Sequence, residues 1–418
     1  MADATVATLA ERDQRRQVVR RRLVVLADQA VSSASNILVA VLVARSVGSA
    51  ESFGAFALAM VAYQIVLSAV RALVGEPVLS LYSHESPDIR RSLIPDTQGA
   101  TVLLGLGCSL VLWPVAVLLG GVSGAALLAL AALLPFVLVQ DTWRYLFVVD
   151  RPVAALVVDS VWLALLVLAL PLAPDGASVA WFVLVWGLGG ALGSAVGAIL
   201  GLRSVDRPHP WRWLAGHRAV SLRFLGESTT GQALGHALMV GLGAIAGLGA
   251  LGAVRAAQVF FGPLNTLHSA TYLAIVPEGA AIRDRPAQLH DKLRKVSLAL
   301  AAIVAGWVVV GVLLPSRWGR ELFGATWDDA DGLILAMGLA AVAAGLQSGG
   351  ILGLRSLADA RRSMRTQLQV IPWLVACPLV GAAVGDALGF AVGTAVGTAI
   401  AATRWWASFR GALHDVEQ

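Results

Sequence analysis

Residues 54–77 read GAFALAMVAYQIVLSAVRALVGEP, and the first seventeen of them carry no charge. About twenty mostly apolar residues are needed to cross the ~30 Å hydrocarbon core of a bilayer as a helix. We therefore expect a membrane-spanning helix here, with Arg71 inside it. A guanidinium in such a helix is costly unless it has a partner, faces a cavity or reaches the interface.

The rest of the chain has a similar composition. Of 418 residues, 57% are hydrophobic and only 14% are charged, and the mean hydropathy is +0.76. A soluble protein of this length could not bury so much apolar surface. Twelve apolar windows follow one another, near 24–44, 54–79, 99–119, 124–148, 153–173, 178–202, 221–248, 252–280, 296–314, 330–354, 366–385 and 387–403. The predicted class is an all-α integral membrane protein with about twelve transmembrane helices.

The basic residues predict the orientation of these helices. If the N-terminus is inside, the inner segments hold 25 of the 31 lysines and arginines, the outer segments hold three, and three lie within spans. Positively charged residues concentrate on the cytoplasmic side of membrane proteins. Both termini are therefore predicted to be cytoplasmic, and the pI of 9.7 reflects topology and does not indicate nucleic-acid binding.

An internal repeat is indicated by glycines spaced by four residues in the sixth and twelfth windows. The second stripe begins at Gly385, 196 residues after Gly189. Three further pairs have similar offsets, namely Asp28 with Glu227, Gly54 with Gly252, and Pro77 with Pro277. Glycines on one helix face allow a neighbouring backbone to approach closely. We expect two six-helix bundles related by a parallel pseudo-two-fold repeat.

The resulting domain prediction has five parts. They are a basic cytoplasmic tail at 1–22, an N-terminal bundle at 23–202, a basic cytoplasmic linker at 203–220, a C-terminal bundle at 221–404 and a cytoplasmic tail at 405–418. In transporters built from repeats, the substrate site usually lies between the halves.

The stretch LADQAVSSASNILVAVLVARSVGSAESFGAFALAMVAYQ at 26–64, followed by RALVGEP at 71–77, resembles a known family. It is similar to the polysaccharide-flippase branch of the multidrug/oligosaccharidyl-lipid/polysaccharide exporter superfamily, which has the MATE-like fold. LGALGAVRAAQVFFGPLNTL at 248–267 is the matching pattern in the second half. The resemblance implies a V-shaped helical transporter that moves a lipid-linked sugar between leaflets by alternating access.

One departure bears on the multidrug members. These tend to carry an acidic residue deep in the first helix for cation coupling, whereas Val39–Val43 here is entirely apolar. The acid that this helix does have, Asp28, is predicted near its cytoplasmic end. The departure argues against a drug/cation antiporter of the usual kind.

Arg71 is the first candidate for the substrate cavity. Glu76 is close enough in sequence to orient it, and Pro77 frees a carbonyl one turn back and favours a kink in the helix. We expect Arg71 to face the cavity and to receive a pyrophosphate, because guanidinium matches phosphate oxygens with paired hydrogen bonds. The alternative is that Arg71 snorkels to the cytoplasmic headgroups.

Arg144 and Arg255 are the other two cavity candidates. Arg144 follows Asp141 by one turn, so an ion pair within the helix at the interface is the simpler interpretation. Arg255 lies near the outer face, where snorkelling is also easy. Together with Arg71 they suit a phosphate path from the inner to the outer mouth.

Four residues are candidates for gating or coupling. Asp28 and Glu227 each lie about one turn into the first helix of their half, where acids also complement the helix dipole. His236 and His268 fall at mid-depth, where histidines can relay protons or simply pack with a hydrogen bond.

No enzymatic, cofactor or metal motif is found, and the Gly247-x-Gly249-x-x-Gly252 pattern falls in a predicted turn between helices and not in a dinucleotide fold. The predicted function is therefore flipping of an undecaprenyl-type lipid-linked oligosaccharide in the bacterial cytoplasmic membrane, for polysaccharide export. The expected partners are that substrate, the bilayer, and a polysaccharide polymerase or glycosyltransferases of the same pathway. The alternatives are a MATE-type multidrug/cation antiporter and a membrane-embedded glycosyltransferase or sugar ligase.

Overall fold

The computed structural model describes residues 24, 27–28, 30–32, 34–82, 85–148, 150–174, 176–201, 207–357 and 359–417. Over these ranges the chain is almost entirely helical and contains no strand. Within the same ranges, nine helices are long and apolar enough to cross a membrane, and Ala30–Ser46 is a shorter apolar helix. The protein is an all-α integral membrane protein, as predicted.

The chain forms two compact units. Unit 1 comprises Met1–Val43 and Ala59–His236, and unit 2 comprises Ala44–Leu58 and Ala237–Gln418. Because the units are defined by which residues lie close together in space, they differ in two places from the two bundles predicted from the sequence. The start of the second helix belongs to unit 2, and the segment that leads into the second half belongs to unit 1.

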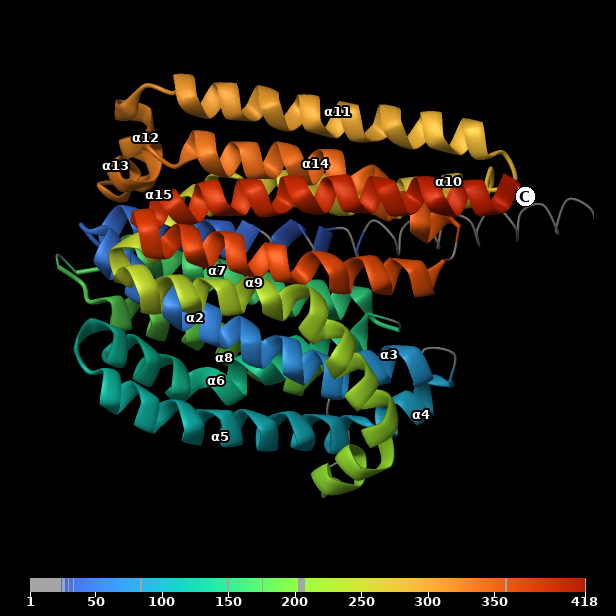
Figure 1. Ribbon diagram of the computed structural model, residues 1–418. Coiled ribbons are helices and arrows are strands. Elements are labelled where there is room, and N and C mark those ends of the chain that lie inside the picture. The colour runs from blue at the N-terminus through green and yellow to red at the C-terminus, as the bar shows by residue number, and fades with distance from the viewer. Residues whose placement is uncertain are drawn as a thin grey trace, which may run out of the picture. The chain divides into compact units, whose positions relative to one another are not determined.

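Unit 1 is a bundle of long helices in which α6 is the central element. This helix packs against α5 on one side and α8 on the other, and α7 packs against α8 (Figure 1). The helices are α2 (Ala50–Val70, which it shares with unit 2), α3 (Glu76–Tyr82), α4 (Pro87–Ser92), α5 (Ile94–Leu119), α6 (Gly121–Phe147), α7 (Pro152–Ala169), α8 (Val179–Gly201) and the first part of α9 (Pro210–Phe260).

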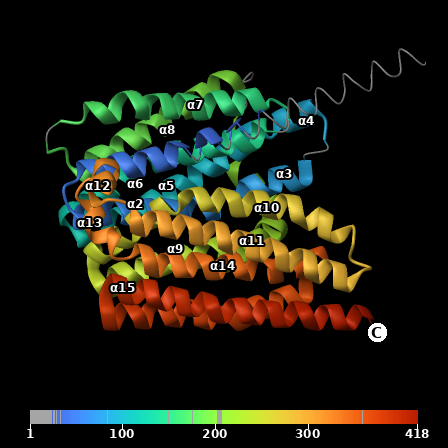
Figure 2. The same cartoon turned by 90° about the horizontal axis from the view of Figure 1, so that it is seen from above.

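Unit 2 is organised around α14, which packs against α11 and α15 (Figure 2). Its core at one end is formed by leucine and aromatic side chains from these three helices, among them Leu293, Leu352 and Phe409. The elements are the rest of α9, α10 (Gly262–Ala280), α11 (Pro286–Leu313), α12 (Ser316–Phe323), α13 (Thr326–Asp331), α14 (Ile334–Ser356) and α15 (Ala360–Glu417).

The two longest helices are each broken at a glycine. In α9, Gly247 has a φ of 83° and a ψ of 174°, a conformation that favours glycine because it has no Cβ. In α15 the break falls at Gly385 and Asp386. Both breaks lie where the sequence predicts turns between helices. Divided at these points, the described helices match the twelve predicted windows, of which 24–44 is only partly described.

The glycine stripes lie at close helix contacts, as predicted. In α8, a Cβ added at Gly197 or Gly201 would clash with the indole of Trp143. In the second half of α15, a Cβ at Gly389 or Gly393 would meet a backbone carbonyl of the first half. The prediction is wrong only for Gly385, which lies in the turn and has nothing near its Cβ position.

Candidate functional site

The site is organised by a change of helix type directly after α2. Residues Arg71–Gly75 form a π-helical turn, and α3 begins at Glu76. Pro77 has no N–H, so the carbonyl of Leu73, four residues earlier, cannot receive its usual helical hydrogen bond. Single π-helical turns inside α-helices are rare and often mark functional sites.

The first part of α9 supplies the missing donors. The indole Nε1 of Trp213 and the hydroxyl of Ser221 both donate to the Leu73 carbonyl, at 3.4 and 3.1 Å. The Trp213 ring stacks on His217 with centroids 3.9 Å apart, and His217 Nε2 lies 2.8 Å from the hydroxyl of Tyr82. The segment that the sequence predicts to be a linker is therefore helical from Pro210 onward and packs on the π-helical turn.

Arg71, the first residue of this turn, is held by a carboxylate on α6. Its Nε and Nη2 donate to the two oxygens of Asp141, at 2.8 and 2.6 Å. This two-point pairing fixes the plane of the guanidinium. The residue that orients Arg71 is thus Asp141, seventy positions along the chain, rather than the expected Glu76.

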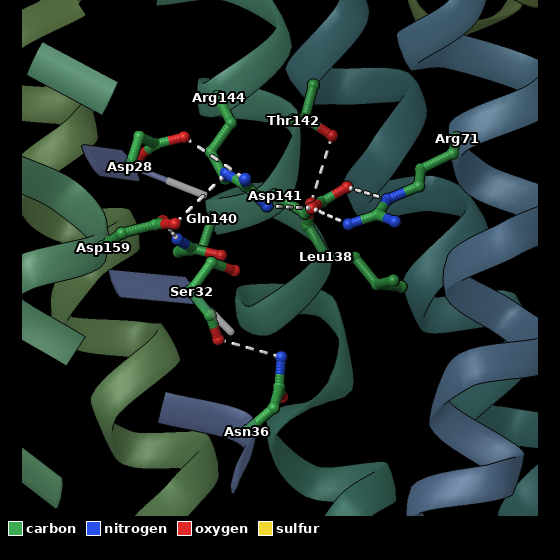
Figure 3. A network of polar contacts seen from close by, with 10 residues as sticks. All are labelled: Asp28, Ser32, Asn36, Arg71, Leu138, Gln140, Asp141, Thr142, Arg144 and Asp159. Atoms are coloured by element: carbon green, nitrogen blue, oxygen red, sulfur yellow. Dashed lines mark hydrogen bonds and ion pairs between the residues drawn. The ribbon is translucent and has the colours of Figure 1, made fainter. Parts of the chain in front are cut away.

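Arg144, one turn further along α6, forms three ion pairs. Its guanidinium lies 3.2 Å from Asp28, 3.2 Å from Asp159 and 3.5 Å from Asp141. The predicted pair with Asp141 is confirmed, and it is the longest of the three. Figure 3 shows the resulting network, in which Gln140 also donates to Asp159 at 2.6 Å.

The network holds more acidic groups than basic ones. Asp28, Asp141 and Asp159 are all nearly inaccessible, and with both arginines they give a formal charge of −1. The Oδ1 of Asp28 is buried without a hydrogen-bond partner, whereas the buried Oδ2 of Asp159 lies 3.2 Å from Arg144 Nε as an ion pair. A buried carboxylate oxygen without a donor is costly, so the site favours a further hydrogen-bond donor at Asp28. Within the described part of the chain, no cluster of His, Cys, Asp or Glu side chains could hold a metal ion.

A cavity of about 230 Å³ lies beside this network, wholly within unit 1. Polar and aromatic side chains from α2, α6, α7, α8 and the first helix form its wall. The lining residues are Ser32, Ser35, Asn36, Tyr63, Gln64, Leu67, Arg71, Gln140, Asp141, Arg144, Asp159, Trp162 and Trp186. Arg71 and Arg144 also border a neighbouring cavity of about 260 Å³, whose wall includes Glu76 and Asp28.

This fold can be compared with those of proteins of known structure. The sequence matches no family model and no curated protein, so the similarity lies in the structure. A multidrug resistance MATE family transporter in an inward-facing conformation superposes with a TM-score of 0.75 over 94% of this chain and 99% of that one, at 13% identity.

A lipid II flippase, MurJ, superposes with a TM-score of 0.72 over 93% of this chain and 87% of that one, at 11% identity. A MOP superfamily transporter from Pyrococcus furiosus, noted for the reversed polarity of its binding pocket, gives 0.57 over 96% of both chains, at 12% identity. The chain has the fold of the MOP superfamily transporters. At these identities the similarity establishes the MOP fold alone, and the substrate must be argued from the site.

Among the described side chains, those of the other predicted site residues do not line either cavity. Arg255 and His268 belong to unit 2, and Glu227 and His236 lie in the part of α9 that belongs to unit 1. Arg255 is half-buried and donates to Gln258 at 3.3 Å. His268 Nδ1 lies 2.9 Å from the Leu264 carbonyl, while its Nε2 is buried without a partner. The side chain of Glu227 is outside the described residues.

Two members of the network were not anticipated from the sequence. Asp159 is a single carboxylate inside the apolar window 153–173, and an isolated charge in a span is itself a signal of function. That signal could have identified it. Gln140 carries no comparable signal, because its role depends on the position of Asp159 on another helix.

Proposed function

We propose that the protein flips a lipid-linked oligosaccharide of the undecaprenyl type from the inner to the outer leaflet by alternating access. The observation that carries this proposal is the cavity of unit 1, which places a partly exposed guanidinium beside amide and aromatic side chains. The MOP fold supports transport, and one protein with this fold is a lipid II flippase.

Arg71 is the group proposed to bind the pyrophosphate. Asp141 occupies Nε and Nη2 and leaves Nη1 for a ligand. The Arg71 side chain is 32% exposed, in contrast to 6% for Asp141, so a phosphate can reach the guanidinium without displacing its partner. The nearby carboxylates weaken the hold on an anion, which suits a carrier because it must release its substrate.

The rest of the wall suits a sugar headgroup. Asn36, Gln64 and Gln140 can donate and accept hydrogen bonds. Trp162 has its indole N–H already donated to the Trp186 carbonyl at 2.8 Å. Its ring is therefore fixed in the wall and offers an apolar surface to a sugar ring.

A multidrug/cation antiporter is the second candidate, and one observation favours it. The apolar run Val39–Val43 argued against coupling, yet Asp28 of the same helix is buried against Arg144. The Oδ1 of Asp28 is buried without a partner, and it is the atom that a coupling proton would occupy. An organic cation would also be attracted by the net negative charge of the network.

Several finer assignments rest on this function. We place the protein in the bacterial cytoplasmic membrane with both termini in the cytoplasm, beside a polysaccharide polymerase or glycosyltransferases of the pathway. We propose that Arg255, in unit 2, contacts the pyrophosphate of the substrate after Arg71 has released it. Coupling or gating roles are assigned to Asp28, Glu227, His236 and His268.

The test uses proteoliposomes with a fluorescent polyprenyl-pyrophosphate oligosaccharide, and a membrane-impermeant reagent that modifies the sugar in the outer leaflet. Arg71→Gln should lower the initial flipping rate at least tenfold. Arg71→Lys should retain part of the rate, because the charge survives but the paired geometry does not. Arg91→Gln is the matched control, since the pair that Arg91 forms with Asp88 in the described part of the chain is exposed.

The same vesicles distinguish the two candidates. Uptake of a fluorescent organic cation that is driven by a proton or sodium gradient, without flipping of the lipid-linked sugar, would establish the antiporter and refute the flippase. Full flipping by Arg71→Gln would remove Arg71 from the mechanism.

A further inference from the structure

A further groove, bordered by two arginines, lies at one end of unit 2, between α11, α14 and α15. It has a volume of about 280 Å³ and shares no residue with the cavity of unit 1. The side chains that matter here are His290, Arg294, Leu298, Leu346, Trp406 and Arg410. The count of basic residues predicts that this end of the unit is cytoplasmic.

Two arginines from different helices converge on this groove. Arg294 of α11 and Arg410 of α15 are exposed, and neither forms an ion pair with a described carboxylate. The two lysines near Arg294 on α11 do form ion pairs. Lys292 pairs with Glu278 at 2.7 Å, and Lys295 pairs with Asp291 at 2.6 Å. The groove therefore keeps two positive charges available to a ligand.

The wall between the arginines is fixed by hydrogen bonds. Trp406 Nε1 donates to the Leu346 carbonyl at 2.7 Å, and the Ser297 hydroxyl donates to the same carbonyl at 3.1 Å. The Gly349 N–H in turn donates to Ser297 at 2.7 Å. The imidazole of His290 lies edge-on to the Trp406 ring at 5.7 Å. A ligand would meet a preorganised surface, which lowers the entropic cost of binding.

An apolar track leads from the arginines into the membrane span. Leu298 on α11 is 50% exposed and Leu346 on α14 is 36% exposed. Leu339 and Leu335, seven and eleven residues before Leu346, are also exposed on α14 and lie on the same helix face. The groove thus combines a cationic end with an apolar continuation, which is the polarity of a phospholipid.

We propose that this groove binds an anionic phospholipid of the inner leaflet. Arg294 and Arg410 donate to its phosphate, because guanidinium forms charge-assisted, paired hydrogen bonds with phosphate oxygens. The acyl chain lies along Leu298 and Leu346. Basic pockets between transmembrane helices on the cytoplasmic side commonly hold such headgroups, and this binding is independent of the substrate cavity.

The test is native mass spectrometry of the full-length protein in detergent, with phosphatidylglycerol or phosphatidylcholine added. The wild type should retain phosphatidylglycerol in preference, and Arg294→Gln with Arg410→Gln should lower its retention at least about tenfold, the effect of ~1.4 kcal/mol. Lys295→Gln with Arg404→Gln is the control, because it removes two charges from the same helices outside the groove. Both control residues are exposed.

Three outcomes would overturn the proposal. They are equal retention of the two lipids, equal losses in the two double variants, and displacement of phosphatidylglycerol by inorganic phosphate alone, which would indicate a site for free phosphate. Arg410→Glu is a second variant that leaves Arg294 in place, and it should repel the headgroup. Arg71→Gln should retain the lipid fully, so failure of the proposed transport function would leave this result unaffected.

Discussion

The ion pair between Arg71 and Asp141 gives the sharpest test of the site. Asp141→Asn removes the charge that both arginines share, while keeping the size of the side chain. Removing one partner of a buried pair costs about 3–5 kcal/mol. The lower end applies here, because Arg71 is 32% exposed and its charge can reach water. We therefore expect a loss of about 3 kcal/mol in the free energy of unfolding.

A double-mutant cycle separates the pair from its surroundings. Arg71→Gln and Asp141→Asn together should cost less than the sum of the two single changes, with a coupling free energy within the ~0.5–3 kcal/mol seen for contacting residues. The assay is equilibrium unfolding in mixed micelles at rising denaturing-detergent content. The exposed pair of Arg91 with Asp88 provides a matched cycle, for which about 0.2–1 kcal/mol is expected.

Additive single changes at Arg71 and Asp141 would refute the reasoning. They would mean that the observed geometry contributes nothing beyond the separate costs of the two residues. A coupling as small as that of the exposed control pair would have the same meaning. Either result would return Arg71 to the role of an interfacial anchor.

Two further predictions concern helix packing in unit 1. Gly197→Leu should lower the free energy of unfolding by about 1–3 kcal/mol through overpacking, because the added side chain would clash with the indole of Trp143. Gly107→Leu is the control. It should be tolerated in the same unfolding assay, because nothing lies within 4 Å of a Cβ at this position. Ser221→Ala and Trp213→Phe should each have small effects, whereas the double variant should lose about 1–3 kcal/mol, because the partly buried Leu73 carbonyl then has no donor. Strict additivity of these two changes would show that water replaces the donors.

The sequence was sufficient to predict the fold class because the relevant signals are local. Apolar windows of bilayer length, glycines spaced by four and the distribution of arginines can each be read along one helix. The breaks at Gly247 and Gly385 fall in predicted turns for the same reason. The similarity to MOP-fold transporters supports the twelve-helix prediction independently of any sequence match.

The network around Arg144 could be predicted only in part. Its pair with Asp141 is one turn along a single helix, so spacing alone indicates it. Its pairs with Asp28 and Asp159 join three helices, and nothing in a single sequence gives the rotation of those helices about their axes. Proximity in sequence favours Glu76 as the partner of Arg71, whereas the observed partner, Asp141, comes from another helix, α6.

The effect of Pro77 on the helix depends on contacts with another part of the chain. The sequence indicates that this proline frees the carbonyl of the residue four positions before it, and a kink is the ordinary expectation. The chain instead widens into the π-helical turn Arg71–Gly75, and donors from α9 satisfy the Leu73 carbonyl. Because Arg71 opens this turn, the backbone that carries it is stabilised by a helix that lies more than 130 residues away in sequence, while Asp141 fixes the plane of the guanidinium. A change in the position of α9 would thereby alter the presentation of Arg71 to the cavity, which links the segment between the two halves of the sequence to the proposed phosphate contact.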